Sequence, residues 1–250
     1  MDSGLYAAYT GLLARTQALD TAANNLANAG TVGFRAQRDY FSGVLAGIDG
    51  STPASQVGNA INDFGILGGS LIDEGQGTIT ATGNPLDLAL DGQGFFAIQT
   101  PQGIQYTRDG GFTRSSDGQL QTQQGEPVLD PSGQPITIPS GTISVASDGS
   151  ISVTTQDGSA IAGRIGIFDF PSGAELSALG TNRFAAPPGL QPTASDATIQ
   201  QGALEGANLD TVHGTMQLIL IQRQAEMMQK ALSVFNNDFD KTAAEDLGRV

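Results

Sequence analysis

The sequence contains no cysteine, and His213 is its only histidine. Without cysteine the chain cannot form disulfides, thiolate nucleophiles or sulfur-ligated metal sites. With one histidine and neither a G-x-S-x-G nor an H-E-x-x-H motif, Ser-His-Asp triads and histidine-ligated zinc sites are excluded as well. We therefore expect no catalytic residues, no metal site and no bound cofactor.

Positive charge is scarce in this chain. It has 11 Lys and Arg residues against 25 Asp and Glu residues, which gives a formal net charge of −14, and only Lys230 and Lys241 are lysines. An acidic surface of this kind repels phosphate groups and anionic lipids. Nucleic acids and membrane surfaces are therefore poor partner candidates.

Long apolar runs are also missing. No stretch approaches the roughly 20 apolar residues that a transmembrane helix needs, so we expect no membrane insertion. The N-terminus does not fit a cleavable signal peptide, because Asp2 replaces the basic start and Arg15 and Asp20 interrupt the apolar core. If the protein leaves the cytoplasm, we expect it to use another export route, without a cleaved signal.

The residues that break helices avoid both ends of the chain. All 11 prolines lie between Pro53 and Pro192, and 30 of the 34 glycines lie between Gly30 and Gly206. This distribution predicts a helix, then a β-rich body, then a second helix. The expected fold class is α+β, mainly β, with a discontinuous coiled-coil domain formed by the two terminal helices and a central β-rich domain.

The first helix is predicted from Ser3 to Asn28, with Gly30 at the position of a left-handed C-cap. A helix of about 26 residues is about 39 Å long. A narrow row of leucines repeats every seven residues along it, which is typical of a helix that packs against other helices. The row consists of Leu5, Leu12, Leu19 and Leu26.

The second helix is predicted from about Asp210 to Ala244, where apolar residues step by threes and fours. Its apolar row consists of Leu209, Val212, Met216, Leu220, Met227 and Val234. Each terminal helix could simply fold back on the β body as ordinary core. Apolar repeats at both ends of a β-rich chain favour packing between helices and between molecules instead, so both rows are candidate subunit-interface residues.

The predicted domains follow from these boundaries. They are residues 1–29 and 208–250 for the terminal helices, 30–81 and 185–207 for extended connectors, and 82–184 for the central β-rich domain. Short alternating runs in the middle of the chain predict strands at residues 86–90, 95–99, 136–138 and 165–170. Six Asp-Gly dipeptides separate such runs and suit tight hairpin turns. They begin at Asp49, Asp91, Asp109, Asp117, Asp148 and Asp157.

Two ligand-binding interpretations of the middle region are weaker than the β-turn interpretation. Asp-Gly repeats can bind calcium, but their intervals of 42, 18, 8, 31 and 9 residues have no fixed period. Residues 92–97 fit the dinucleotide-binding motif G-x-G-x-x-A. Residues 95–99, however, are expected to form a strand and not the helix whose N-terminus would bind a pyrophosphate.

The end of the first helix is a second candidate site. Asn side chains can bond nearby backbone groups, and Gly30 and Gly33 permit a sharp turn. The segment is either a joint between the helix and the body or simply the end of a helix. The candidate joint residues are Asn24, Asn25, Asn28, Gly33 and Phe34.

Four ordered blocks resemble the bacterial flagellar axial proteins, the family of rod, hook and hook-junction subunits. Residues 24–35, NNLANAGTVGFR, are similar to the family's N-terminal signature. Residues 201–210, QGALEGANLD, resemble the hinge that opens its C-terminal helix, and Arg223 falls where that helix usually carries an arginine. The blocks that resemble the β domain of rod and hook members are residues 82–90, 92–96, 106–112 and 118–129.

The resemblance implies a structural subunit of the flagellar rod, the shaft that crosses the periplasm in the basal body. Such a subunit assembles with other rod subunits and with copies of itself in a helical lattice. It reaches this place unfolded, through the flagellar type III export apparatus. The length and the tail Phe239–Val250 are closest to a proximal-rod subunit, and a distal-rod or hook-type subunit of the same family is the alternative.

Two other classes of protein remain as alternatives. A secreted adhesin or phage-tail component also combines a β body with oligomerising helices, although it should form a stable trimer alone. A glycan hydrolase could use a carboxylate pair among the 25 acidic residues, but nothing in their spacing identifies a pair.

Overall fold

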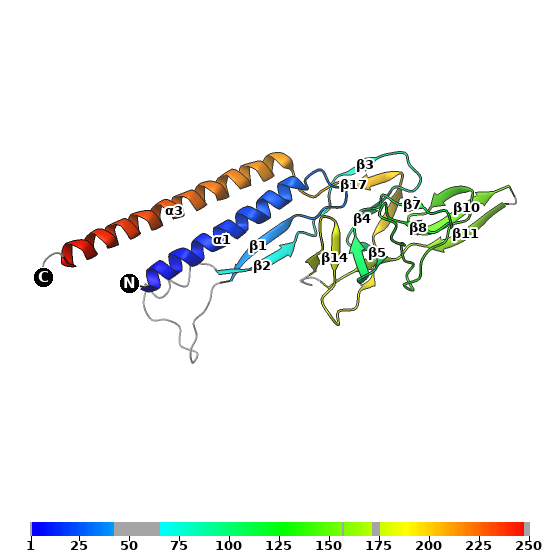
Figure 1. The fold of residues 1–250 in the computed structure, drawn as a ribbon. Coiled ribbons are helices and arrows are strands. Elements are labelled where there is room, and N and C mark those ends of the chain that lie inside the picture. The colour runs from blue at the N-terminus through cyan, green and yellow to red at the C-terminus, as the bar shows by residue number, and fades with distance from the viewer. Residues whose placement is uncertain (1, 43–65, 157, 172–175, 248–250) are drawn as a thin grey trace. The chain divides into compact units, whose positions relative to one another are not determined.

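The computed structural model describes residues 2–42, 66–156, 158–171 and 176–247 (Figure 1). The chain divides into two compact units, each made of separate segments. We call them the helical unit, residues 1–26, 37–70 and 211–250, and the β unit, residues 27–36 and 71–210. The fold is α+β, with one helix at each end and a β-rich middle, as the sequence predicts.

The helical unit contains both long helices. α1 spans Asp2–Ala27 and α3 spans Thr211–Leu247, which are 26 and 37 residues long. The two helices run antiparallel in Figure 1. The unit also holds the two-stranded sheet of β1 (Gln37–Ser42) with β2 (Ile66–Ile72). No helix in the described part of the chain has an apolar stretch long enough to span a bilayer.

The predicted left-handed cap of the first helix is wrong. Gly30 does not adopt a left-handed backbone, and the first glycine after the helix to do so is Gly33, with φ +68°. The chain leaves the helix through a tight turn instead, in which the Asn28 carbonyl accepts a hydrogen bond from the Thr31 amide at 2.9 Å. A turn of this kind continues right-handed geometry, so it does not need a left-handed residue.

A six-stranded antiparallel sheet forms the centre of the β unit, with strand order β13-β14-β6-β5-β12-β15. Its strands are β5 (Phe95–Thr100), β6 (Gly103–Thr107), β12 (Ile167–Asp169), β13 (Ser177–Ala178), β14 (Arg183–Ala185) and β15 (Thr193–Ala194). Side chains of β5 alternate between two apolar clusters, because successive strand residues point to opposite faces. Phe96 and Ile98 enter the larger cluster, and Phe95 and Ala97 enter the smaller one.

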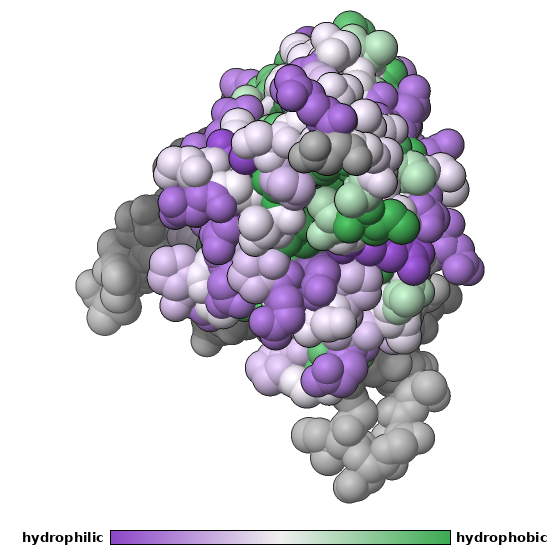
Figure 2. Space-filling model, turned by 90° about the vertical axis from the view of Figure 1, so that its right-hand side faces the viewer, coloured by the Kyte–Doolittle hydropathy of each residue, from purple (hydrophilic) through white to green (hydrophobic). Residues whose placement is uncertain are grey.

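The β unit also contains four smaller sheets. A three-stranded sheet has the order β11-β10-β9, and three two-stranded sheets pair β4 with β16, β3 with β17 and β7 with β8. The strands are β3 (Ile79–Ala81), β4 (Leu88–Asp91), β7 (Thr113–Arg114), β8 (Leu120–Gln121), β9 (Thr142–Val145), β10 (Ser150–Thr155), β11 (Gly158–Arg164), β16 (Thr198–Gln201) and β17 (Ala203–Glu205). The face drawn in Figure 2 is mainly hydrophilic, with apolar residues gathered in limited patches.

The predicted strands are mostly present. Residues 86–90, 95–99 and 165–170 overlap β4, β5 and β12, and residues 136–138 form only an isolated bridge. A strand follows the G-x-G-x-x-A motif as predicted. Residues expected to be extended connectors carry strands instead: β1 to β3 lie within 30–81, and β15 to β17 lie within 185–207.

The Asp-Gly dipeptides do not all form hairpin turns. Asp117 and Asp148 lie in the turns of the hairpins β7-β8 and β9-β10. Asp91 instead joins β4 to β5, which belong to different sheets, and Asp109 follows β6 without a returning strand. Gly110 allows its backbone to lie against the Leu88 carbonyl, where a Cβ would clash. The remaining two dipeptides begin outside the described residues, at Asp49 and Asp157.

Candidate functional site

α3 is apolar on two opposite faces. The inner face is buried or half-buried, and its residues step by threes and fours: Gly214, Leu218, Ile221, Ala225, Met228 and Leu232. Residues two positions further along a helix lie about 200° around its axis. Residues at that offset from the inner face form an outer row of large apolar side chains, each 45–67% exposed: Val212, Met216, Ile219, Leu220, Met227 and Val234. The helix thus leaves one apolar face in solvent.

The predicted residues of the second helix fall almost entirely on this outer row. Five of the six are in it, and Leu209 is half-buried in the β unit, before α3 begins. An exposed row is what a contact with another molecule requires. The assignment of these residues to a subunit interface remains a prediction, because only one copy of the chain is described.

α1 buries small residues. Ala14, Ala18 and Ala22 are at most 9% exposed and form one stripe with Asn25. The predicted leucine row lies about a quarter turn away from this stripe. Its members Leu12, Leu19 and Leu26 are half-buried, and the side chain of Leu5 lies outside the described part of the chain.

Asn25 fixes the start of β1 within the helical unit. Its side-chain amide donates to the Gln37 carbonyl at 2.8 Å, and its Oδ1 accepts from the Gln37 amide at 2.9 Å. The side chain therefore binds both backbone groups of one residue, as a neighbouring strand would. Asn24 is exposed, and Asn28 is half-buried in the turn that follows α1.

Gly33 and Phe34 belong to the β unit and are both buried. The Gly33 amide donates to the Glu205 carbonyl at 2.8 Å. A Cβ on Gly33 would lie within 3.0 Å of backbone atoms of both Arg108 and Asp109, so the close approach of the two chain segments requires glycine here. The predicted joint residues are therefore divided between the units, with Asn24 and Asn25 in the helical unit and Asn28, Gly33 and Phe34 in the β unit.

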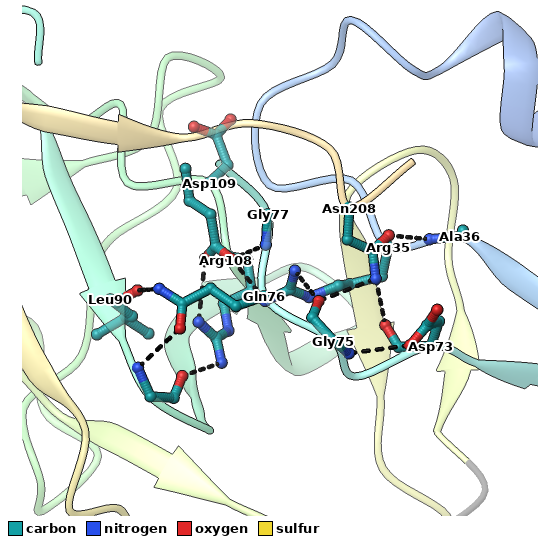
Figure 3. Close-up of polar contacts among 12 residues, drawn as sticks. Arg35, Ala36, Asp73, Gly75, Gln76, Gly77, Leu90, Arg108, Asp109 and Asn208 are labelled. Atoms are coloured by element: carbon teal, nitrogen blue, oxygen red, sulfur yellow. Dashed lines mark hydrogen bonds and ion pairs between the residues drawn. The ribbon is translucent and has the colours of Figure 1, made fainter. Parts of the chain in front are cut away.

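A buried group of charges lies next to Gly33 and was missed by the sequence analysis. Figure 3 shows two of its members, Arg35 and Arg108. Glu205 accepts from the guanidinium of Arg35 at 2.8 Å and from that of Arg108 at 3.0 Å. The three residues are at most 2% exposed. We call them the charge node.

The charge node contains two cations and one anion, and neighbouring carbonyl groups accept one further hydrogen bond from each arginine. Arg35 Nη1 donates to the Gly75 carbonyl, and Arg108 Nη2 donates to the Gly92 carbonyl, both at 2.6 Å. Burial, and then the charge of Arg35, lower the pKa of Arg108 to about 10, while Glu205 acts in the opposite direction. The Nε atoms of both arginines have no hydrogen-bond partner among the described residues.

Asn208 joins the same segments a few residues later (Figure 3). Its Oδ1 accepts from the Ala36 amide at 2.7 Å, and its amide group donates to the carbonyls of Asp73 and Gly75 at 2.7 and 2.9 Å. The segment that follows α1 and the segment that precedes α3 are therefore bonded to each other and to the chain around Gly75.

The sequence held one signal for the charge node. Arg35, Arg108 and Glu205 each lie in a block that carries the family resemblance. Glu205, however, lies 97 residues from Arg108 and 170 residues from Arg35, so no local pattern pairs them. In the described segments no group of three or more His, Asp or Glu residues is placed to hold a metal ion.

Two family models match the chain. One, described as flagella basal body rod protein, covers residues 5–35, and the other, described as the flagellar hook protein FlgE/F/G D1 domain, covers residues 89–153. The flagellar basal-body rod protein FlgF of Mesorhizobium japonicum is 34% identical over 90% of both chains. FlgF of Caulobacter vibrioides is 35% identical over the full length of both chains, and the rod protein FlgG of Agrobacterium fabrum is 32% identical over 90% of this chain and 92% of its own.

Proposed function

Because the chain belongs to the family of flagellar basal-body rod proteins, we propose that it is built into the rod through the apolar rows of its two terminal helices. Membership of this family makes the chain a structural subunit of the flagellar rod, which assembles with other rod subunits in the basal body. The finer proposal concerns which surface makes those contacts, and it rests on one observation, the exposed outer row of α3.

The outer row suits a contact between molecules because α3 already buries its opposite face. A line of six large apolar side chains in water is the pattern of a helix seam without its partner. Leu220, Met227 and Val234 repeat every seven residues, as do Leu12, Leu19 and Leu26 of α1. In each set the first and last residues are 14 positions apart, about 21 Å along the helix. The outer row of one copy therefore matches the leucine row of the next in length and period.

A contact between two different rows is heterologous, because the surfaces on the two copies differ. Heterologous contacts that do not close into a ring build a helical lattice. Such a lattice distributes torque over many side-by-side contacts along the shaft. We propose that copies of this chain, and its neighbours in the rod, join in a coiled-coil arrangement of this kind.

The position in the rod and the export route are part of the same proposal. A proximal-rod position is supported by relatives named FlgF at 34–35% identity that extend over 90% or more of both chains. A distal-rod or hook-type position is the alternative, since relatives named FlgG reach 32–33%. Export through the flagellar type III apparatus is supported by membership of the rod family, and the lack of cysteine is compatible with this route.

A strain that lacks the gene, complemented with variants, tests the proposal. Met227→Asp places a charge in the outer row, and Gln229→Asp places the same charge on an exposed position outside this row, about 200° around the helix axis from Met227. We expect the first variant to abolish swimming and to leave basal bodies with truncated rods in electron micrographs, while the second swims normally. Normal swimming by Met227→Asp would show that the outer row is not the contact.

A further inference from the structure

The charge node lies where both terminal helices connect to the β unit. Arg35 comes eight residues after the end of α1, and Glu205 comes six residues before the start of α3. The ion pair between them, at 2.8 Å, therefore bonds the segment that leaves one helix to the segment that enters the other. Both segments belong to the β unit, so the bond is internal to it.

Arg108 connects this pair to the central sheet. It follows β6 directly, and its guanidinium donates to the Gly92 carbonyl and lies 5.4 Å from the ring centroid of Phe95 in β5. Glu205 and Arg108 thus link both connecting segments to the sheet by hydrogen bonds. The Gly33 amide bonded to the Glu205 carbonyl adds a backbone link at the same place.

Stability alone does not explain why this position is charged. Apolar residues of similar volume often replace a buried ion pair without loss of stability. Charge-assisted hydrogen bonds from a guanidinium fork are directional, however, and hold two groups in one geometry, whereas apolar contacts are non-directional. A buried ionic group at this junction is therefore suited to fixing positions under load.

We propose that the charge node is a mechanical clasp that fixes the two connecting segments to each other and to the central sheet, with Glu205 as the positioning residue. The torque that loads the clasp rests on the proposed function, whereas the clasp itself is a property of the isolated chain. Without it, each helix pulls on its own segment of the β unit. With it, both segments and the sheet share the load.

Force spectroscopy on the full-length chain tests the clasp. Because the native sequence has no cysteine, Ala27→Cys and Thr211→Cys provide two unique attachment points, both exposed, at the outer ends of the two segments. The measured quantity is the rate at which the segments separate under constant force. It is compared with the thermal unfolding temperature of each variant, which a purely stabilising role would also change.

The main variant replaces the whole node by apolar residues, Arg35→Met with Arg108→Leu and Glu205→Met. We expect it to separate at least about 10-fold faster under force, a larger change than the shift in its unfolding temperature accounts for, because the charge-assisted bonds are gone. Arg183→Met, which removes the partly exposed ion pair with Glu126 in the same unit, is the control and should leave the rate unchanged.

An apolar node that separates at the wild-type rate would overturn the proposal. If that variant does not fold, Arg35→Lys tests the clasp in its place. Lysine keeps the charge but cannot bond Glu205 and the Gly75 carbonyl through one fork. Faster separation of Arg35→Lys supports the clasp, and an unchanged rate refutes it. Failure of the proposed function would appear elsewhere, as normal swimming by Met227→Asp.

Discussion

Replacing Gly33 by alanine should strongly destabilise the β unit. Gly33 has φ +68°, a left-handed conformation that costs other residues about 1–2 kcal/mol. The added Cβ would also lie within 3.0 Å of backbone atoms of Arg108 and Asp109, and overpacking of this kind costs about 1–3 kcal/mol. The free energy of unfolding should therefore fall by about 2–5 kcal/mol. At roughly 2–4 °C per kcal/mol, the Tm falls by the order of 10 °C.

Gly83→Ala is the matched control for this prediction. Gly83 has nearly the same backbone conformation, with φ +78°, but nothing lies within 4 Å of the position that a Cβ would occupy. It should therefore lose only the conformational term, about 1–2 kcal/mol. Thermal unfolding followed by circular dichroism compares the two variants. Equal Tm values would refute the argument that the close approach to Arg108 and Asp109 is what requires glycine at position 33.

Three further substitutions test other parts of the structure. Leu12→Asp should abolish swimming while the purified variant keeps the circular dichroism signal of its β unit, because a charge in a helix seam costs several kcal/mol; normal swimming would show that the leucine row is not a contact. Glu205→Gln should lower the free energy of unfolding by about 3–5 kcal/mol, since it leaves two buried guanidinium groups without an anion; an unchanged Tm would contradict this account of the charge node. Burial, and then the nearby Asp169, raise the pKa of Glu74 above its ordinary value of 4.5. The ionised form is therefore disfavoured in the folded state, and stability from this group is highest below pH 4.5 and falls as the pH rises through the folded-state pKa. Glu74→Gln should accordingly raise the Tm at pH 7 and lose this advantage below pH 4.5, and a Tm difference independent of pH would exclude the explanation.

The two terminal helices could be predicted because their signal is local. Proline is absent from both ends and glycine nearly so, and the predicted limits lie within about three residues of α1 and α3. The strand β5 was also predictable, since Phe95 and Phe96 begin a short apolar run, and the structure buries this run on both faces. In each case the pattern that predicts the element lies in residues that are close together in the sequence.

The features that the sequence did not reveal depend on distant or weak signals. The alanine stripe of α1 is less conspicuous than the leucine repeat, although small residues permit the closer packing that decides burial. Strands such as β15 and β17 contain only two and three residues, which is too short to show a period. The charge node required the pairing of residues up to 170 positions apart, and no local rule provides it.

The long separation between Arg35 and Glu205 also sets the order in which the β unit can fold. A chain that emerges from its N-terminus presents residues 27–36 early, but their partner is residue 205 of 250. Closing a flexible loop of 170 residues costs about 4–5 kcal/mol in chain entropy, so the contact forms only when the intervening strands help to close it. The β unit thus stays incomplete until most of the chain has appeared. A chain whose C-terminal segment is held away from the rest cannot complete the β unit.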